Sequence, residues 1–265
     1  MCSSDLEYAN IIYTVSDGIA TIKLNRPKAL NALNSEINAD IMAAINEVKA
    51  DPSVRVLIVT GSERAFAAGA DVKEMAEATP RYAREFSGLA IEINNVLESM
   101  PIPTIAAVAG FAFGGGFEMP LACDFRIGGP RTSLAFPECG LGIIPGFGGT
   151  QRMARIIGTG PAMELIYTAD TIDANRALEI GMVNHVVPAD QLMDEAMKLA
   201  EKICKNAQKA IRASKLAIRR GMDCDISTAV SYEALAFATC FGTEDQKEGM
   251  QAFLEKRKEK HFKNA

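Results

Sequence analysis

Two short runs of apolar residues, each followed by a loop of small residues, constrain the possible fold of this sequence most. Residues 54–60 and 104–109 are almost wholly apolar, as expected of strands that are covered on both faces. A helical pattern of apolar residues follows each run. Because strand and helix alternate in this way, the sequence predicts an α/β fold with a mostly parallel core.

The two ends of the sequence differ from this middle part. Near the start, Asp17-Gly18 separates two runs rich in Ile, Val, Tyr and Thr, which predicts a β-hairpin. After about residue 150, the pattern becomes helical. We therefore expect residues 1–190 to form the α/β core, and residues 191–265 to form a helical region packed on it or on a neighbouring subunit.

Composition limits the partners and the location. The net charge of -5 argues against nucleic acid as the main partner, because proteins that bind it usually carry a basic face. Six cysteines without a Cys-x-x-Cys pair, together with two histidines, offer no set of zinc ligands, so we expect no metal. Residues 1–7 do not resemble a signal peptide, and no apolar stretch is long enough to span a membrane. Free thiols suit a reducing compartment, so we expect a cytoplasmic protein.

Two loops of small residues are candidate parts of a binding site. Residues 65–71 (AFAAGAD) and 109–118 (AGFAFGGGFE) both follow a buried strand, and the second opens a helix. Small side chains let a ligand approach the backbone, and a helix start leaves N–H groups unpaired. Two such loops can direct two N–H donors at one carbonyl oxygen, which is an oxyanion hole. The alternative is that the glycines only permit tight packing.

Two glutamates in apolar surroundings are the candidate acid and base. Glu118 lies one turn into the helix that begins at the glycines, and Glu138 lies in a turn rich in Gly and Pro. Burying a carboxyl is costly unless it is paired, protonated or used in catalysis. Two carboxyls with separated pKa values suit general acid–base catalysis. Alternatively, Glu118 is only a helix-start acid and Glu138 a surface loop residue.

Five stretches that include these residues resemble the crotonase (enoyl-CoA hydratase) superfamily. They follow one another at that family's spacing, and the likeness runs from about residue 8 to 260. The resemblance implies a crotonase-like spiral of stacked β-β-α units, with a C-terminal helical region used in trimerisation. It also implies a homotrimer or a homohexamer. The stretches are residues 25–33, 65–71, 114–118, 137–152 and 241–250.

The same resemblance implies an acyl-CoA thioester whose carbonyl oxygen lies between two backbone N–H groups. Carried over to this sequence, the two donors are Ala68 and Gly115. Phe237 and Lys256 match positions that help to hold CoA, with a neighbouring subunit as one possible source. The other positions implied to bind substrate or CoA are Lys28, Ala29, Leu30, Gly69, Ala70 and Asp71.

Members of this superfamily share the stabilisation of a thioester enolate but catalyse different reactions. Hydratases resemble one another in having glutamates at the positions of Glu118 and Glu138. The resemblance therefore implies reversible syn hydration of trans-2-enoyl-CoA to 3-hydroxyacyl-CoA, in fatty-acid or butanoate metabolism. Glu118 would take a proton from water and Glu138 would donate one to carbon 2, with no cofactor beyond the CoA of the substrate. The alternatives are an enoyl-CoA isomerase of the same fold and, more remotely, an RNA-binding or scaffold member.

One residue departs from the pattern of the family. Phe136 stands two residues before Glu138, where many short-chain hydratases have Gln. Phe cannot form a hydrogen bond with the two acids, so the pocket is expected to be drier. Short-chain substrates are expected, but the sequence leaves the acyl chain length and the physiological direction of the reaction open.

Overall fold

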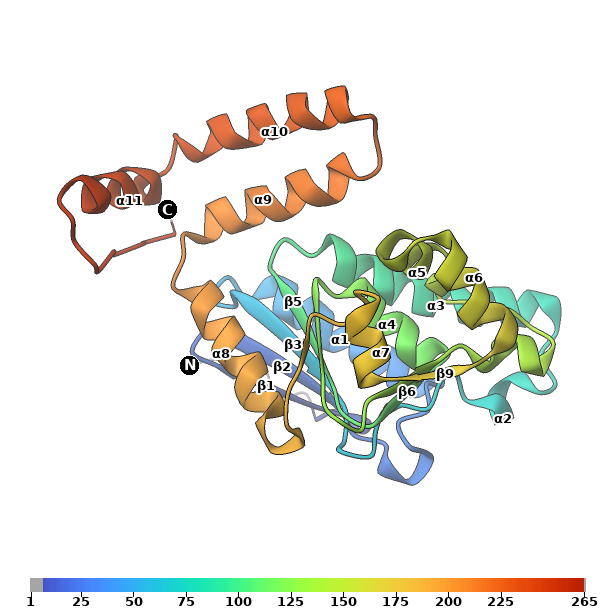
Figure 1. Ribbon diagram of the computed structural model, residues 1–265. Helices are drawn as coiled ribbons and strands as arrows, with labels where there is room; N and C mark the ends of the chain where they lie inside the picture. Colours follow the sequence, from blue (N-terminus) through green and yellow to red (C-terminus); the bar gives the residue numbers. More distant parts are fainter. Residues whose placement is uncertain (1–6, 265) are drawn as a thin grey trace.

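Two β-sheets form the core of the computed structural model, which describes residues 7–264 (Figure 1). The expectation about a signal peptide concerns residues of which 1–6 lie outside this described part. The larger sheet contains, in spatial order, β1 (Ile11–Ser16), β2 (Ile19–Leu24), β3 (Val56–Thr60), β5 (Thr104–Val108), β7 (Phe125–Gly128) and β10 (His185–Val186). The smaller sheet contains β4 (Ala65–Ala67), β6 (Phe111–Phe113), β8 (Ser133–Ala135) and β9 (Thr171–Asp173).

Consecutive pairs of strands contribute one strand to each sheet. β3 is followed by β4, β5 by β6, and β7 by β8, and the second strand of each pair joins the smaller sheet. β3, β5 and β7 are parallel neighbours, and so are β4, β6 and β8. The mostly parallel core and the spiral of β-β-α units that we expected from the sequence are therefore confirmed.

Two local expectations have different outcomes. Asp17 (φ 53°) and Gly18 (φ 78°) are both left-handed, as a type I′ turn requires, and they join the antiparallel strands β1 and β2. The predicted hairpin is therefore present. The segment 65–71, expected to be a loop throughout, instead begins with β4, because Ala65 and Ala67 pair with β6. This pairing ties the start of the loop to the smaller sheet.

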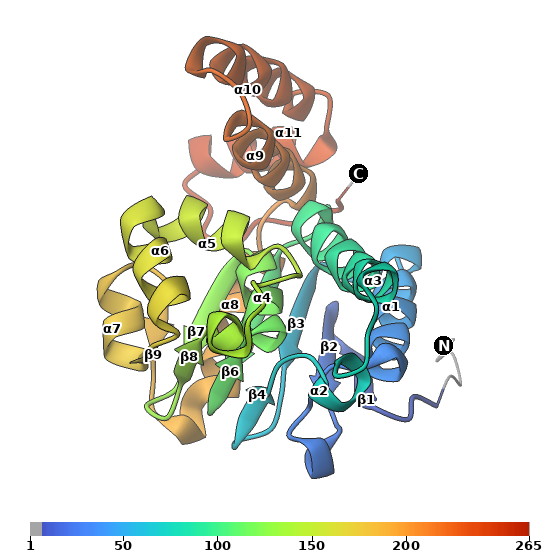
Figure 2. The same cartoon turned by 90° about the vertical axis from the view of Figure 1, so that its right-hand side faces the viewer.

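Helices cover both faces of the larger sheet. Leu57 packs in one hydrophobic cluster with α1 and α3, whereas its neighbour Ile58 packs in a second cluster with α8. Adjacent residues of a strand point to opposite faces, so β3 is buried on both sides. In Figure 2, α1 and α3 lie on the right of the view and α5, α6 and α7 on the left, and all five contribute to the first cluster, whereas α8 covers the other face of the sheet. These helices are α1 (Ser35–Ala50), α2 (Val72–Met75), α3 (Pro80–Ser99), α4 (Gly115–Ala122), α5 (Gly149–Ile157), α6 (Thr159–Thr168), α7 (Ala174–Glu179) and α8 (Leu192–Cys204), with short 3₁₀ helices η1 (Pro27–Ala29), η2 (Pro137–Leu141) and η3 (Ala189–Gln191).

The last three helices extend away from this core (Figure 1). They are α9 (Gln208–Gly221), α10 (Ile226–Cys240) and α11 (Glu244–Leu254), and we call them the helical arm. α8 does not belong to the arm, because its Leu192, Ala196 and Ala200 are buried against the larger sheet. The structure therefore begins the separate helical region at α9, later than the expected boundary between residues 190 and 191.

Candidate active site

Glu118 is held inside the protein by the helix that begins at the three glycines. Gly114 has a φ of 49°, which L side chains rarely adopt, and α4 starts at the next residue. One turn later, Glu118 is only 1% exposed. Its Oε1 accepts hydrogen bonds from the backbone N–H groups of Phe147 (2.7 Å) and Gly149 (2.6 Å). The loop before α5 therefore fixes this carboxyl.

Glu138 reaches the start of the same helix from η2. Its carboxyl lies against Gly114, where an added Cβ would collide with the Oε1 of Glu138. Its Oε2 is buried and has no hydrogen-bond partner among residues 7–264. The structure therefore brings the two candidate acids together at the N-terminal end of α4. Glu118 does lie in the first turn of the helix, but both carboxyls are buried, so Glu138 is not a surface loop residue.

Burial changes the acid strength of both carboxyls. Loss of solvation raises the pKa of Glu118 to about 7, against the effect of the Gly149 and Phe147 amides, which favour the ionised form. The charge of Glu138 raises the pKa of Glu118 further. Loss of solvation also raises the pKa of Glu138 to about 7. Because the charge of Glu138 acts on Glu118, the two carboxyls titrate as a pair rather than independently.

Two backbone N–H groups of the predicted loops donate no hydrogen bond among residues 7–264. Gly115 is the first residue of α4, so its N–H has no acceptor within the helix. Ala70 pairs with Leu33 in a parallel bridge, in which Leu33 N–H donates to the Gly69 carbonyl (2.7 Å) and Asp71 N–H donates to the Leu33 carbonyl (2.8 Å). In that pattern the N–H of Ala70 points away from Leu33. Ala70 and Gly115 are therefore the candidate donors.

Ala68, which the resemblance implied as a donor, is not free. Its N–H donates to the carbonyl of Leu30 at 3.0 Å. The left-handed φ of 110° at Gly69 interrupts the extended chain between Ala68 and Ala70, so their N–H groups do not face the same neighbour. The structure therefore contradicts Ala68 as an oxyanion donor and favours Ala70, which the resemblance implied only as a binding residue.

The segment Lys28-Ala29-Leu30 lies beside the loop that carries Ala70. It forms the end of η1, and Leu30, with a left-handed φ of 51°, closes that turn. The Leu30 carbonyl accepts the Ala68 N–H, and the following residue, Asn31, donates its side-chain amide to the carbonyls of Ala65 (3.2 Å) and Phe66 (3.0 Å). The structure therefore brings two of the sequence stretches together.

Asp71 has structural partners at the end of this loop. Its Oδ2 forms an ion pair with Arg26 at 2.8 Å, and its Oδ1 accepts the backbone N–H of Lys73 at 3.2 Å. The hydrogen bond from Arg26 lowers the pKa of Asp71. Asp71 therefore caps α2 and ties it to the segment before η1, which keeps the neighbouring Ala70 in position.

Phe237 and Lys256 lie in or beside the helical arm. Phe237 on α10 is 65% exposed and packs edge to face on Phe241, with ring centroids 5.0 Å apart. Lys256 follows α11 and has a left-handed φ of 57°. Within a single chain the arm extends away from α4 (Figure 1), so the structure does not bring these two residues to the glutamates.

Residues of the loop before α5 position Glu118, although no sequence pattern had marked them as candidates. Besides the amides of Phe147 and Gly149, this loop depends on Arg152, which is only 9% exposed. Arg152 Nη1 donates to the Phe147 carbonyl (3.3 Å), and its Nη2 forms an ion pair with Glu98 of α3 (2.7 Å). The glycine-rich stretch around residue 147 was the available signal, but it served only for the resemblance.

Three further observations concern the described residues as a whole. Cys123, Cys139, Cys204, Cys224 and Cys240 are all free. Among residues 7–264, no group of three or more His, Cys, Asp or Glu side chains could hold a metal ion. In the same range, no helix is both long enough and apolar enough to cross a membrane.

Known proteins resemble this chain along nearly its whole length. Residues 14–264 match the enoyl-CoA hydratase/isomerase family. The crotonyl-CoA hydratase of Syntrophomonas wolfei is 49% identical over 96% of this chain and 98% of that protein. The short-chain-enoyl-CoA hydratase of Clostridium acetobutylicum is 48% identical over 98% of this chain and 100% of that protein. The crystal structure of the enoyl-CoA hydratase from Bacillus anthracis has a TM-score of 0.93 at 40% identity, covering 97% of this chain and 100% of that one.

The spiral of β-β-α units, with two buried glutamates at the start of α4, makes this chain a crotonase-fold protein. The match over residues 14–264 and the identities of 49% and 48% define the family more narrowly. The chain belongs to the enoyl-CoA hydratase/isomerase family, as the sequence stretches predicted.

Proposed function

We propose that this chain catalyses the reversible syn addition of water to short-chain trans-2-enoyl-CoA, with Glu118 and Glu138 as the acid–base pair. Enoyl-CoA hydration itself follows from the family and from the two hydratase relatives. The names of those relatives, a crotonyl-CoA and a short-chain-enoyl-CoA hydratase, support short acyl chains. The roles of the two acids are supported by the meeting of two buried carboxyls with raised pKa values at one helix start.

The reaction can be followed atom by atom. The N–H groups of Ala70 and Gly115 bind the thioester oxygen and stabilise the negative charge that develops on it, which makes carbon 3 electrophilic. Ionised Glu118, oriented by the amides of Phe147 and Gly149, takes a proton from water as the water oxygen bonds to carbon 3. Protonated Glu138 donates its proton to carbon 2. Transfer of a proton from Glu118 to Glu138 restores the pair for the next turnover.

The acid pair favours hydration over movement of the double bond. An isomerase can use one group that carries a proton from one carbon of the acyl chain to another. Hydration needs a base for the water and an acid for carbon 2 in the same site. Two carboxyls with pKa values raised to about 7 can hold one proton between them at neutral pH, which supports the second requirement.

We also infer that the chain assembles as a homotrimer or homohexamer through the helical arm. A folded monomer rarely exposes a large contiguous apolar patch, whereas an interface between subunits requires one. Phe237 lies on this arm and Lys256 lies directly after it, and we propose that they reach CoA bound at a neighbouring subunit. The large apolar side chains exposed on the arm include Ile218, Met222, Ile226, Val230, Leu235, Phe237, Phe253 and Leu254.

The remaining assignments follow from the same proposal. The segment Lys28-Ala29-Leu30 and the loop from Gly69 to Asp71 lie side by side and would line the CoA of the substrate. CoA enters as part of the substrate, and the proposed proton transfers use only the two carboxyls and backbone amides. A cytoplasmic location is supported by the free cysteines, which suit a reducing compartment.

The proposal is tested by following the loss of the conjugated enoyl thioester absorbance of crotonyl-CoA. The Glu138→Gln variant should hydrate crotonyl-CoA about 10²-fold or more slowly, because Gln cannot donate the proton. Glu92→Gln on the exposed side of α3 is the matched control and should have the wild-type rate. A wild-type rate in Glu138→Gln would refute the role of Glu138. Migration of the double bond of a 3-enoyl-CoA without hydration would support the isomerase alternative.

A further inference from the structure

Phe147 contacts both the acid Glu118 and the candidate oxyanion donor Gly115. Its backbone N–H donates to the Oε1 of Glu118 at 2.7 Å. Its ring lies so close to Gly115 that an added Cβ at Gly115 would overlap ring carbons Cδ2 and Cε2. A thioester with its oxygen at the Gly115 N–H and its carbon 3 at Glu118 therefore lies beside this ring.

Contacts with α3 and with Arg152 fix the position of Phe147. Phe147 is 5% exposed, and its ring packs against Phe86 of α3 with centroids 5.7 Å apart. Its carbonyl accepts hydrogen bonds from the side chains of Asn94 (3.0 Å) and Arg152 (3.3 Å). A change of position would break these contacts and also the hydrogen bond to Glu118. Phe147 therefore forms a fixed wall rather than a movable flap.

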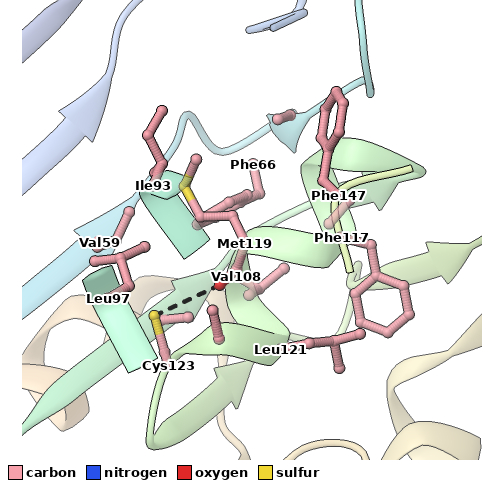
Figure 3. Close-up of a cluster of buried hydrophobic side chains, with 14 of the residues drawn as sticks. Val59, Phe66, Ile93, Leu97, Val108, Phe117, Met119, Leu121, Cys123 and Phe147 are labelled. Carbon is pink, nitrogen blue, oxygen red and sulfur yellow. Dashed lines mark hydrogen bonds between the residues drawn. The ribbon is translucent and has the colours of Figure 1, made fainter. Parts of the chain in front are cut away.

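The space beside the wall offers no room for a longer acyl chain. Phe147, Met119 and Ile93 lie in one buried cluster (Figure 3), and the small space between them, next to Gly115, cannot hold a water molecule. The same space is lined by Asn38 and Asn94. Nδ2 and Oδ1 of Asn38 and Oδ1 of Asn94 are buried without a hydrogen-bond partner among the described residues. An apolar tail forced into this space would contact unpaired amide groups, which is unfavourable.

We propose that Phe147 limits the acyl group of the substrate to about four carbons, by closing the space into which a longer chain would extend from the acid pair. This inference rests on the proposed function and adds the residue that determines chain-length specificity. Phe147 takes part in no proton transfer through its side chain. Its ring affects only the length of the acyl chain that can bind, while its backbone N–H orients Glu118.

The full-length Phe147→Ala variant tests this inference. We expect its ratio of kcat/KM for trans-2-octenoyl-CoA to that for crotonyl-CoA to rise at least about tenfold over the wild-type ratio, because one methylene accommodated in an apolar pocket is worth about 10–200-fold. Leu97→Ala removes a fully buried side chain of α3 outside this space and should leave the ratio unchanged. An unchanged ratio in Phe147→Ala overturns the inference, as does a wild-type protein that hydrates both thioesters equally well.

A milder variant covers the case in which Phe147→Ala does not fold. Phe147→Leu keeps an apolar side chain but removes part of the ring volume, and it should shift the same ratio in the same direction by a smaller factor. No shift in a folded Phe147→Leu also overturns the inference when the alanine variant is lost. A wild-type protein that hydrates neither thioester would refute the proposed function instead, so the two failures are distinct.

Discussion

The Oε1 of Glu118 lies 2.6 Å from the backbone nitrogen of Gly149. A side chain at Gly149 has no room, because an added Cβ would lie 2.8 Å from the Cγ of Glu118 and 2.7 Å from the ring of Phe136. The loop therefore approaches the acid as closely as glycine permits. The orientation of Glu118 depends on the backbone of this loop, and changes in the loop are expected to affect catalysis.

Glu118→Gln should remove most of the hydration activity without altering the fold. The amide oxygen of Gln can accept the same two N–H groups, but Gln cannot take a proton from water. We expect kcat for crotonyl-CoA to fall by about 10²–10⁴-fold, the usual contribution of a general base. Circular dichroism and the melting temperature check the fold. A variant that retains wild-type kcat would show that another group activates the water.

The pH dependence of hydration should be bell-shaped with its maximum near neutral pH. Activity needs Glu118 ionised, so the rate should fall as pH decreases below its pKa, raised to about 7. Activity also needs Glu138 protonated, so the rate should fall as pH increases above its pKa, also raised to about 7. Measurement of kcat/KM from pH 5 to 9, roughly two units on either side, gives both limbs. A profile that stays flat across this range would contradict the assignment.

The buried Glu118 should make the folded protein less stable at neutral pH than at acidic pH. Its pKa rises from 4.5 in the unfolded chain to about 7 in the folded protein, so the folded state binds more protons between these values. The stability contribution is present below pH 4.5 and is lost as pH rises to about 7. Glu118→Gln lacks this loss and should be more stable than wild type at pH 8, by up to about 3 kcal/mol. The difference should vanish below about pH 4.5, and denaturant unfolding at both pH values tests it.

Arg152 is expected to support Glu118 through the loop before α5. Removing the side chain in Arg152→Ala takes one of two side-chain donors from the Phe147 carbonyl and one of two ion-pair partners from Glu98, so we expect a lower melting temperature and about tenfold lower kcat. Arg152 also lowers the pKa of Glu118, so the acidic limb of the pH profile should move to higher pH.

Two further variants separate these effects of Arg152. Arg152→Lys keeps the charge but loses the fork of donors, so it should retain the wild-type pH profile while losing stability. Arg155→Ala on the exposed side of α5 should change neither property. Equal shifts of the acidic limb in Arg152→Lys and Arg152→Ala would contradict the electrostatic role.

Some features of this protein follow from short segments of sequence and were predicted correctly for that reason. The hairpin at Asp17-Gly18 needs only two residues that tolerate positive φ, and both have it. The buried strands β3 and β5 were visible as apolar runs. These elements depend on neighbouring residues, so a sequence pattern is enough to identify them.

The boundary of the helical region and the identity of the second N–H donor could not be predicted from a local sequence pattern. α8 has the same amphipathic pattern as an arm helix, and only the position of the larger sheet shows that it belongs to the core. Ala68 and Ala70 are the same residue type two positions apart. Their local sequence does not show that one N–H is taken by Leu30 while the other points elsewhere.

The sequence by itself therefore determined the α/β class through apolar periodicity and turn residues, and the family, with the spiral it implies, through the resemblance of five stretches. It also singled out the two glutamates as candidates. Only the tertiary structure decided how the acids are held and which amide is free. Glu118 is oriented by amides about thirty residues further along the chain, and its pKa is raised by burial among elements from several parts of the sequence. Hydrogen bonding and desolvation depend on distance in space, which sequence separation does not specify.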